Sequence, residues 1–184
     1  MTRRSHHASH IGGVVWLTGL PGSGKTTLAE GLGERLSGLG WRVRVLDGDR
    51  LRGGLCADLG FSPRDRAENL RRAGEVAALF VEAGFIVVAA FVSPCQADRD
   101  RVRGRIPGAF HEVHLRASLE VCEQRDPKGL YRKARAGQIV DFTGISAPYE
   151  VPLHPELGLD TGSETVEQSL EALTAHVQRR FRLE

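Results

Sequence analysis

The sequence contains few cysteines and few aromatic residues. Its 184 residues include three cysteines, Cys56, Cys95 and Cys122, and only 6% of the residues are aromatic. Three cysteines cannot build a disulfide framework, and no two of them have the Cys-x-x-Cys spacing of a zinc site. We therefore expect reduced thiols in a cytoplasmic protein.

Long apolar runs and an excess of one charge are also missing. The longest strongly apolar stretch covers residues 85–92. It is far shorter than the roughly 20 residues that cross a membrane as a helix, so we expect no membrane association. Lys and Arg number 25 against 23 Asp and Glu, which leaves a net charge of +2. This balance excludes a general polyanion binder and predicts no nucleic-acid partner.

Short apolar runs alternate with helical patterns along the chain. Leu28, Leu32 and Leu36, for example, recur at the spacing of one helix face. This alternation is typical of β-α-β units and a parallel sheet. We expect a flexible tail over residues 1–11 and a single domain over 12–184. We predict strands at 14–18, 43–46, 85–91 and 111–115, and helices at 27–39, 66–83, 98–105, 118–124 and 163–181.

A glycine-rich segment joins the first predicted strand to the first predicted helix. Residues 19–26 match the pattern G-x-x-x-x-G-K-[ST] of phosphate-binding loops, or P-loops. Backbone N–H groups and the positive end of the helix bind phosphates there, while Lys25 adds charge and the Thr26 hydroxyl suits Mg²⁺. The motif predicts a nucleoside triphosphate site in an α/β, P-loop kinase-like three-layer sandwich with a mostly parallel central sheet. We assign to this site Gly19, Leu20, Pro21, Gly22, Ser23, Gly24, Lys25, Thr26 and Thr27.

Two carboxylates come directly after the second predicted strand. Asp47 and Asp49 flank a glycine, and the carboxyl ends of parallel strands are where α/β proteins bind ligands. In phosphoryl transfer, such a carboxylate orients the acceptor hydroxyl, takes its proton or holds Mg²⁺. A plain Asp-Gly-Asp turn is the alternative, because both residue types favour turns.

An aromatic, a guanidinium and an amide come together at the start of the next helix. Arg66 and Asn69 share one helix face, with Phe61 just upstream. This combination suits a flat heterocycle that bears an anion. A solvated charged face is the alternative interpretation.

The stretch 126–149 is long, rich in glycine and basic residues, and weakly periodic. Such a stretch inside a compact domain is typical of a functional loop. We interpret it as a mobile lid whose cations offset charge on the transferred phosphoryl group and exclude water. Nucleic-acid binding fits less well, because a single aromatic is interleaved with the cations. The cations of this region are Arg125, Lys128, Arg132, Lys133 and Arg135.

Seven segments in this order resemble the adenylylsulfate kinase family of P-loop kinases, over about residues 12–162. The run 122–131 and the Phe-Thr-Gly-Ile segment at 142–145 are the most specific, because P-loop kinases in general do not carry them. The matching segments are 19–27, 46–49, 58–62, 65–69 with 71–72, 91–94, 122–131, and 141–145 with 148–150.

The resemblance implies a reaction. The γ-phosphate of ATP would pass to the 3′-hydroxyl of adenosine 5′-phosphosulfate, a step of sulfate assimilation, with Mg²⁺ bound and in a homodimer. Asp47 would be the base or the hydroxyl-orienting group, and Asp49 would lie near the metal with Thr26. Ser93 matches a serine that carries phosphate in some members. The implied catalytic residues are Lys25, Asp47, Asp49 and Ser93, and Arg125 joins the ATP site.

The resemblance also implies an acceptor pocket. Phe61 and Phe142 would sandwich the adenine of the acceptor, because stacking a base on an aromatic ring contributes about 1–3 kcal/mol. Three polar residues, Arg52, Arg66 and Asn69, would hold the rest of the nucleotide. The implied acceptor-binding set is Asp47, Arg52, Phe61, Arg66, Asn69, Val92, Ser93 and Phe142.

Four positions depart from the family pattern. Arg50 replaces a usual Asn, Cys95 an aromatic or His, Gln96 an Arg or Lys, and Val140 a Lys. Because two of these changes remove a cation and one adds a cation, a related kinase for a different nucleotide or small-molecule hydroxyl is an alternative function. A non-catalytic nucleotide-binding module is a further alternative.

Overall fold

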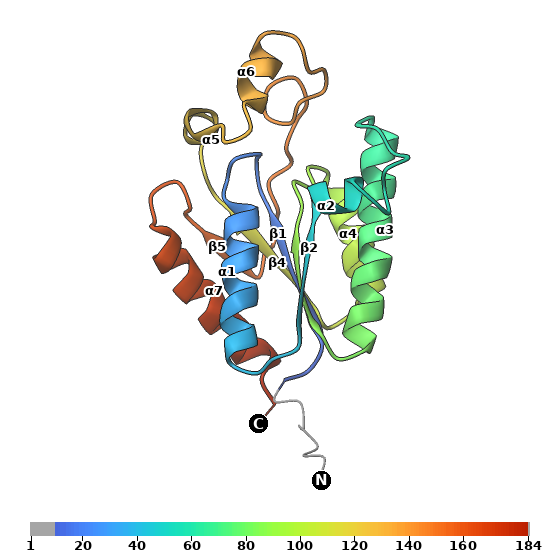
Figure 1. The fold of residues 1–184 in the computed structure, drawn as a ribbon, viewed down its shortest axis with the longest axis vertical. Coiled ribbons are helices and arrows are strands. Elements are labelled where there is room, and N and C mark those ends of the chain that lie inside the picture. The colour runs from blue at the N-terminus through green and yellow to red at the C-terminus, as the bar shows by residue number, and fades with distance from the viewer. Residues whose placement is uncertain (1–9, 184) are drawn as a thin grey trace.

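The computed structural model describes residues 10–183. A parallel sheet of five strands lies at the centre of this part of the chain, in the order β2-β3-β1-β4-β5. Helices α1 and α7 cover one face of the sheet, and α3 and α4 cover the other (Figure 1). In chain order the elements are β1 (Gly13–Thr18), α1 (Lys25–Gly38), β2 (Val43–Asp47), α2 (Gly48–Arg52), α3 (Pro63–Glu82), β3 (Ile86–Ala90), α4 (Gln96–Arg105), β4 (Phe110–Leu115), α5 (Leu119–Arg125), α6 (Leu130–Arg135), β5 (Leu157–Leu159) and α7 (Val166–Phe181).

This architecture confirms the expected α/β sandwich of three layers. Every residue of β1 and of β3 is buried, which explains why these strands are apolar without alternation. Along β1, Val15 and Leu17 face the α1 and α7 side, while Val14 and Trp16 face the α3 and α4 side. The sheet therefore separates two cores that are packed independently.

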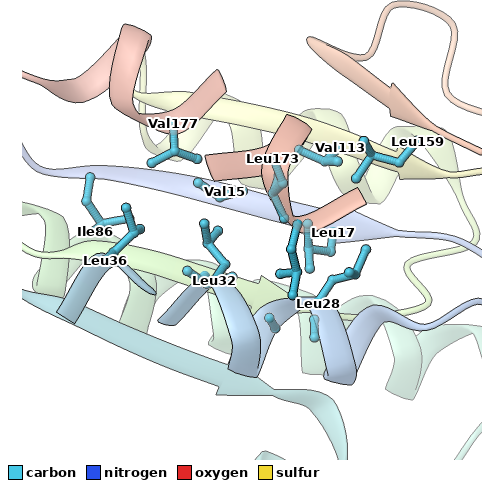
Figure 2. Close-up of a cluster of buried hydrophobic side chains, with 14 of the residues drawn as sticks. Val15, Leu17, Leu28, Leu32, Leu36, Ile86, Val113, Leu159, Leu173 and Val177 are labelled. Atoms are coloured by element: carbon cyan, nitrogen blue, oxygen red, sulfur yellow. The ribbon is translucent and has the colours of Figure 1, made fainter. Parts of the chain in front are cut away.

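The first core lies between the sheet and helices α1 and α7. Leu28, Leu32 and Leu36 extend from α1 toward β1 and β3, and Leu173 and Val177 approach from α7 (Figure 2). The spacing of four that predicted this face of α1 is therefore confirmed. In the second core, the Trp16 ring stacks on Phe91 at a centroid distance of 4.8 Å.

A third, smaller cluster lies beneath the lid. Cys122, Tyr131 and Phe142 are buried together, and the Tyr131 hydroxyl donates a hydrogen bond of 2.9 Å to the Pro21 carbonyl in the P-loop. In Figure 1, α5 and α6 lie at the upper end of the molecule, beyond the ends of the strands. Leu20 of the P-loop packs against this cluster, so apolar contacts as well as charge hold the lid on the P-loop.

Three short elements differ from the sequence expectations. α2 is a short helix that the sequence did not predict, and the Asp47 side chain caps it by accepting from backbone N–H groups. α6 lies within the stretch that the sequence left without regular structure. The Asp126 carboxylate accepts from the N–H groups of Tyr131 and Arg132 at its start. β5 is too short for any apolar period to reveal it.

The domain begins earlier than the sequence indicates. His10 is buried and its ring stacks on Trp41 at 4.8 Å, while the Ile11 N–H donates to the Phe181 carbonyl at 2.8 Å. These two residues thus belong to the folded domain and not to the expected tail over 1–11. Residues 1–9 of that tail lie outside the described residues. From residue 10 to residue 183, no helix is both long and apolar enough to cross a membrane.

Two histidines meet between β4 and α7. The His111 Nδ1 atom lies 3.0 Å from His176 Nε2, and His176 is only 3% exposed. Burial, reinforced by the charge of His111 and of the nearby arginines Arg179 and Arg180, lowers the pKa of His176 to about 4. The folded protein therefore favours the neutral imidazole.

This pair predicts acid-sensitive stability. A folded pKa below the unfolded value means that the unfolded chain binds the proton more tightly, so stability falls as the pH drops from about 6.5 towards 4. At about 1.4 kcal/mol per pKa unit, the loss in that window is about 3 kcal/mol. Denaturant unfolding at pH 7 and pH 4 measures it, with His176→Gln as the comparison. If the variant loses as much free energy of unfolding as the wild type, His176 is not the source.

Candidate active site

A cleft of about 630 Å³ opens at the carboxyl edge of the sheet. The P-loop, α2, α3, the turn after β3, the lid and the segment from the end of β5 into α7 all contribute walls. All of the site residues that the sequence predicted line this cleft, with two exceptions in the P-loop, Gly19 and Leu20. The structure therefore brings together residues that lie more than a hundred positions apart in the chain.

The P-loop takes its shape from glycines with left-handed backbone angles. Gly22 has φ 78° and Gly24 has φ 98°. A Cβ atom at Gly22 would lie 2.9 Å from the Cys122 carbonyl oxygen, so this position excludes larger residues for steric as well as conformational reasons. Gly24 also caps the start of α1, which directs the positive end of that helix into the cleft.

Lys25 folds back over the P-loop. Its ammonium donates to the carbonyls of Gly19 at 3.0 Å and Leu20 at 2.8 Å. Burial lowers the pKa of Lys25 to about 8. The cation is thus held against the loop, at the place where P-loops bind the β- and γ-phosphates.

Asp47 connects the P-loop to α2. One carboxylate oxygen accepts a hydrogen bond of 2.9 Å from the Thr26 hydroxyl. The other accepts from the N–H groups of Asp49 at 3.0 Å and Arg50 at 3.3 Å. Asp49 instead forms an ion pair with Lys128 from the lid. The sequence paired Thr26 with Asp49 at the metal, whereas in the structure the carboxylate beside Thr26 belongs to Asp47.

Arg66 ties α3 to the lid. Its guanidinium donates to the Phe61 carbonyl at 2.8 Å, to the Thr143 hydroxyl at 2.8 Å and to the Asp141 carbonyl at 2.5 Å. The Arg52 guanidinium lies 4.3 Å from the centre of the Phe61 ring. The predicted acceptor residues are therefore adjacent, and Arg66 has an additional role in holding the lid.

Asn69 is one of the predicted acceptor residues that line the cleft. It is buried, and within the described residues its Oδ1 atom has no hydrogen-bond partner. A buried polar atom without a partner at a cleft indicates a place where a ligand donates a hydrogen bond. The Phe61 ring nearby is 64% exposed, whereas Phe142 is buried and packs edge-on against Tyr131 at 5.0 Å.

Ser93 lies in the cleft wall with its hydroxyl engaged in a buried network. The Trp16 indole donates to its Oγ atom at 3.1 Å, and the Ser93 hydroxyl donates to Thr18 at 2.9 Å. Thr18 in turn donates to the Val92 carbonyl at 2.8 Å. These contacts give Ser93 a structural role, and its catalytic role stays a prediction.

Part of the cleft escaped the sequence analysis. A wall beside the P-loop comes from the segment after β5 and from the start of α7, where Val166 is 53% exposed. Arg125, which the sequence assigned to ATP, donates to the Thr161 carbonyl at 2.5 Å. The residues that add this wall are Thr161, Glu164, Val166 and Ser169. Only the topology reveals them, because β5 ends at the same edge of the sheet.

The four positions that depart from the family pattern lie outside the lining of the cleft. Arg50 is exposed on α2, Cys95 caps α4, and Gln96 bonds to Asp100 and Arg99. Val140 is exposed near the tip of the lid. These departures therefore do not alter the walls of the site.

Comparison with known proteins identifies the family. Residues 11–160 match the sequence profile described as adenylylsulphate kinase. An adenylyl-sulfate kinase from Acaryochloris marina is 53% identical over 178 residues, which cover 96% of this chain and 87% of that protein. One from Geotalea uraniireducens is 57% identical over 168 residues, 91% of this chain and 81% of that protein.

A solved structure agrees with these relatives. The APS kinase from Mycobacterium tuberculosis in complex with AMPPNP and APS is 44% identical, with a TM-score of 0.88 over 91% of this chain and 98% of that one. Because the profile spans most of the chain and the relatives align along nearly all of it, the chain belongs to the adenylylsulfate kinase family.

Proposed function

We propose that this protein transfers the γ-phosphate of ATP to the 3′-hydroxyl of adenosine 5′-phosphosulfate and releases ADP and the 3′-phosphorylated product. One observation carries the proposal. A single cleft is lined by the P-loop, by Phe61, Arg66 and Asn69, and by Asp47, which bonds to Thr26 of the P-loop. A phosphate donor and a flat anionic acceptor would therefore meet at one carboxylate.

The donor half of the proposal rests on the P-loop. Its backbone N–H groups and the start of α1 would bind the triphosphate, and Lys25 would place a positive charge beside the transferred group. Phosphoryl transfer needs little covalent chemistry from the protein, so position and charge account for most of the acceleration.

Mg²⁺ fits the residues beside the P-loop. The Thr26 hydroxyl and the Asp47 carboxylate are hard oxygen donors that lie 2.9 Å apart. Among residues 10–183 no group of three or more His, Cys, Asp or Glu could hold a metal, so phosphate oxygens and water would complete the shell. When bound, the ion would neutralise charge on the phosphates. Asp49 is the second candidate ligand.

The acceptor half rests on the opposite wall. The exposed Phe61 ring offers a face for a base, and Asn69 Oδ1 offers an acceptor for an N–H or hydroxyl group. Arg52 and Arg66 supply positive charge for the sulfated end of the acceptor. Asp47, which is held by Thr26 and by the α2 backbone, would orient the acceptor hydroxyl and take its proton.

The lid completes the site. The Tyr131 bond to Pro21, the Lys128 pair with Asp49 and the Arg66 bonds to the lid backbone fasten it over the cleft. A lid in this place would keep water from competing with the acceptor for the phosphoryl group. Homodimer formation, a cytoplasmic location and a part in sulfate assimilation stay predictions.

A coupled assay of ADP release tests the proposal. We expect ADP release with MgATP to rise by orders of magnitude on addition of adenylylsulfate, because bound acceptor replaces water as the nucleophile. A panel of other nucleotides and small alcohols under the same conditions is the control. Turnover of another alcohol without turnover of adenylylsulfate would refute the assignment of the acceptor. Binding of ATP without transfer to any acceptor would favour a non-catalytic module.

Replacement of Lys25 tests the donor half. Lys25→Met keeps the apolar stem and removes the charge, and we expect kcat to fall by about 10²–10³ or more, as for the loss of other transition-state donors. Because the pKa of Lys25 in the free protein is about 8, the Kd of the wild type for ATP should also rise above pH 8, and that of the variant should not. Lys133→Met is the control, because the structure places this exposed lid cation outside the lining of the cleft. Near-normal turnover by Lys25→Met would refute the placement.

Replacement of Phe61 tests the acceptor half. Phe61→Ala should raise the KM for adenylylsulfate about tenfold, because a lost stacking contact is worth about 1–3 kcal/mol. The KM for ATP should stay unchanged. Leu79→Ala is the matched control, since Leu79 is 65% exposed and lies on α3 outside the cleft. Equal rises in both KM values would mean that Phe61 does not belong to the acceptor pocket.

A further inference from the structure

An arginine outside the cleft joins two of its walls. Arg99 lies on α4 and is only 1% exposed. Its Nη1 atom donates to the Ser93 carbonyl at 2.7 Å, and its Nη2 atom donates to the Glu150 carbonyl at 2.8 Å. One buried guanidinium therefore holds two backbone segments that come from distant parts of the chain.

The first of these segments is the turn after β3. Ser93 has φ 41°, a left-handed angle that residues other than glycine seldom adopt and that surrounding contacts must maintain. The turn lines the cleft through Val92, Ser93 and Pro94. A hydrogen bond from a rigid guanidinium to the carbonyl of the strained residue is the kind of contact that fixes such a turn.

The second segment is the return of the lid to the sheet. The Glu150 N–H donates to the Pro94 carbonyl at 2.8 Å, and the Glu150 carboxylate accepts from the Gln96 N–H at 2.6 Å. Eight residues upstream on the same segment, Phe142 lines the acceptor side of the cleft, next to Thr143. The contacts of Glu150 therefore anchor the end of the lid segment that carries Phe142.

A buried carboxylate fixes Arg99 in turn. The Arg99 Nε atom lies 2.6 Å from the Glu112 carboxylate on β4, and both side chains are buried. Arg103 approaches the same carboxylate at 3.3 Å but also pairs with Glu156. A buried ion pair adds little net stability, and its consequence here is that the charge of Arg99 is balanced inside the protein while its two Nη atoms bond to the backbone.

We propose that Arg99 is a positioning residue for the acceptor: by bonding the Ser93 and Glu150 carbonyls it fixes the lid segment that carries Phe142 against the cleft. This inference rests on the proposed function for its kinetic consequence. Its structural content, that Arg99 restrains residues 141–150, does not depend on the substrate.

Paired variants test the proposal. Arg99→Met combined with Glu112→Met removes both buried charges, so that no unpaired charge remains in the core. We expect the KM for adenylylsulfate to rise about tenfold, with the KM for ATP changed by less than about twofold. Arg103→Met is the control, because it breaks ion pairs of the same network and leaves both Arg99 bonds in place. Arg99→Lys, which keeps the charge beside Glu112, should recover part of the loss.

Hydrogen exchange separates this inference from the proposed function. In the double variant the amides of residues 141–150 should exchange about tenfold faster than in Arg103→Met. Equal exchange in the two variants, or an unchanged KM for adenylylsulfate in a folded double variant, would overturn the proposal. If the double variant does not fold, Arg99→Lys takes its place. Faster exchange over residues 141–150 and a higher KM for adenylylsulfate than in Arg103→Met then support the proposal, and equal values overturn it. Failure of the wild type to use adenylylsulfate would refute the proposed function, and the exchange comparison would still decide the role of Arg99.

Discussion

The Asp47 carboxylate is the constraint on which the site depends. β3 separates β2 from β1 in the sheet, so the P-loop and the end of β2 need a link between them. Asp47 provides it, with one oxygen on the Thr26 hydroxyl and the other on the N-terminus of α2. Since both oxygens are engaged, the side chain has one orientation. The walls of the cleft, and any hydroxyl brought to them, are placed relative to that orientation.

Positive charge is arranged in two tiers around this carboxylate. Lys25 is buried in the P-loop, where desolvation lowers its pKa. An anion bound beside it would stabilise the charged form of its side chain. Lys128 lies on the lid and Arg66 on α3, and both make contacts that hold the lid over the cleft. The packing of Tyr131 on the P-loop couples the tiers. The packing of the lid on the P-loop therefore determines where the lid cations lie.

Patterns with a physical cause in the backbone could be predicted from the sequence. The leucines of α1 and the unbroken apolar strands predicted the layers. The spacing of the glycines predicted the P-loop, because its left-handed backbone angles favour glycine. Phe61, Arg66 and Asn69 indicated a pocket for a flat anionic heterocycle, whereas the identity of the acceptor came from the resemblance. The wall at Thr161 and Val166, the capping of α6 by Asp126 and the Ser93 network could not be predicted, because they depend on tertiary neighbours that no local pattern encodes.

The bridge between His10 and Arg182 brings the two ends of the described chain together. They meet at the lower end of the molecule in Figure 1, whereas the lid lies at the upper end. Polypeptide added at either end would therefore emerge away from the opening through which nucleotides pass. The same arrangement suits circular permutation, because a short linker could join the two ends and new chain termini could be placed in a surface loop.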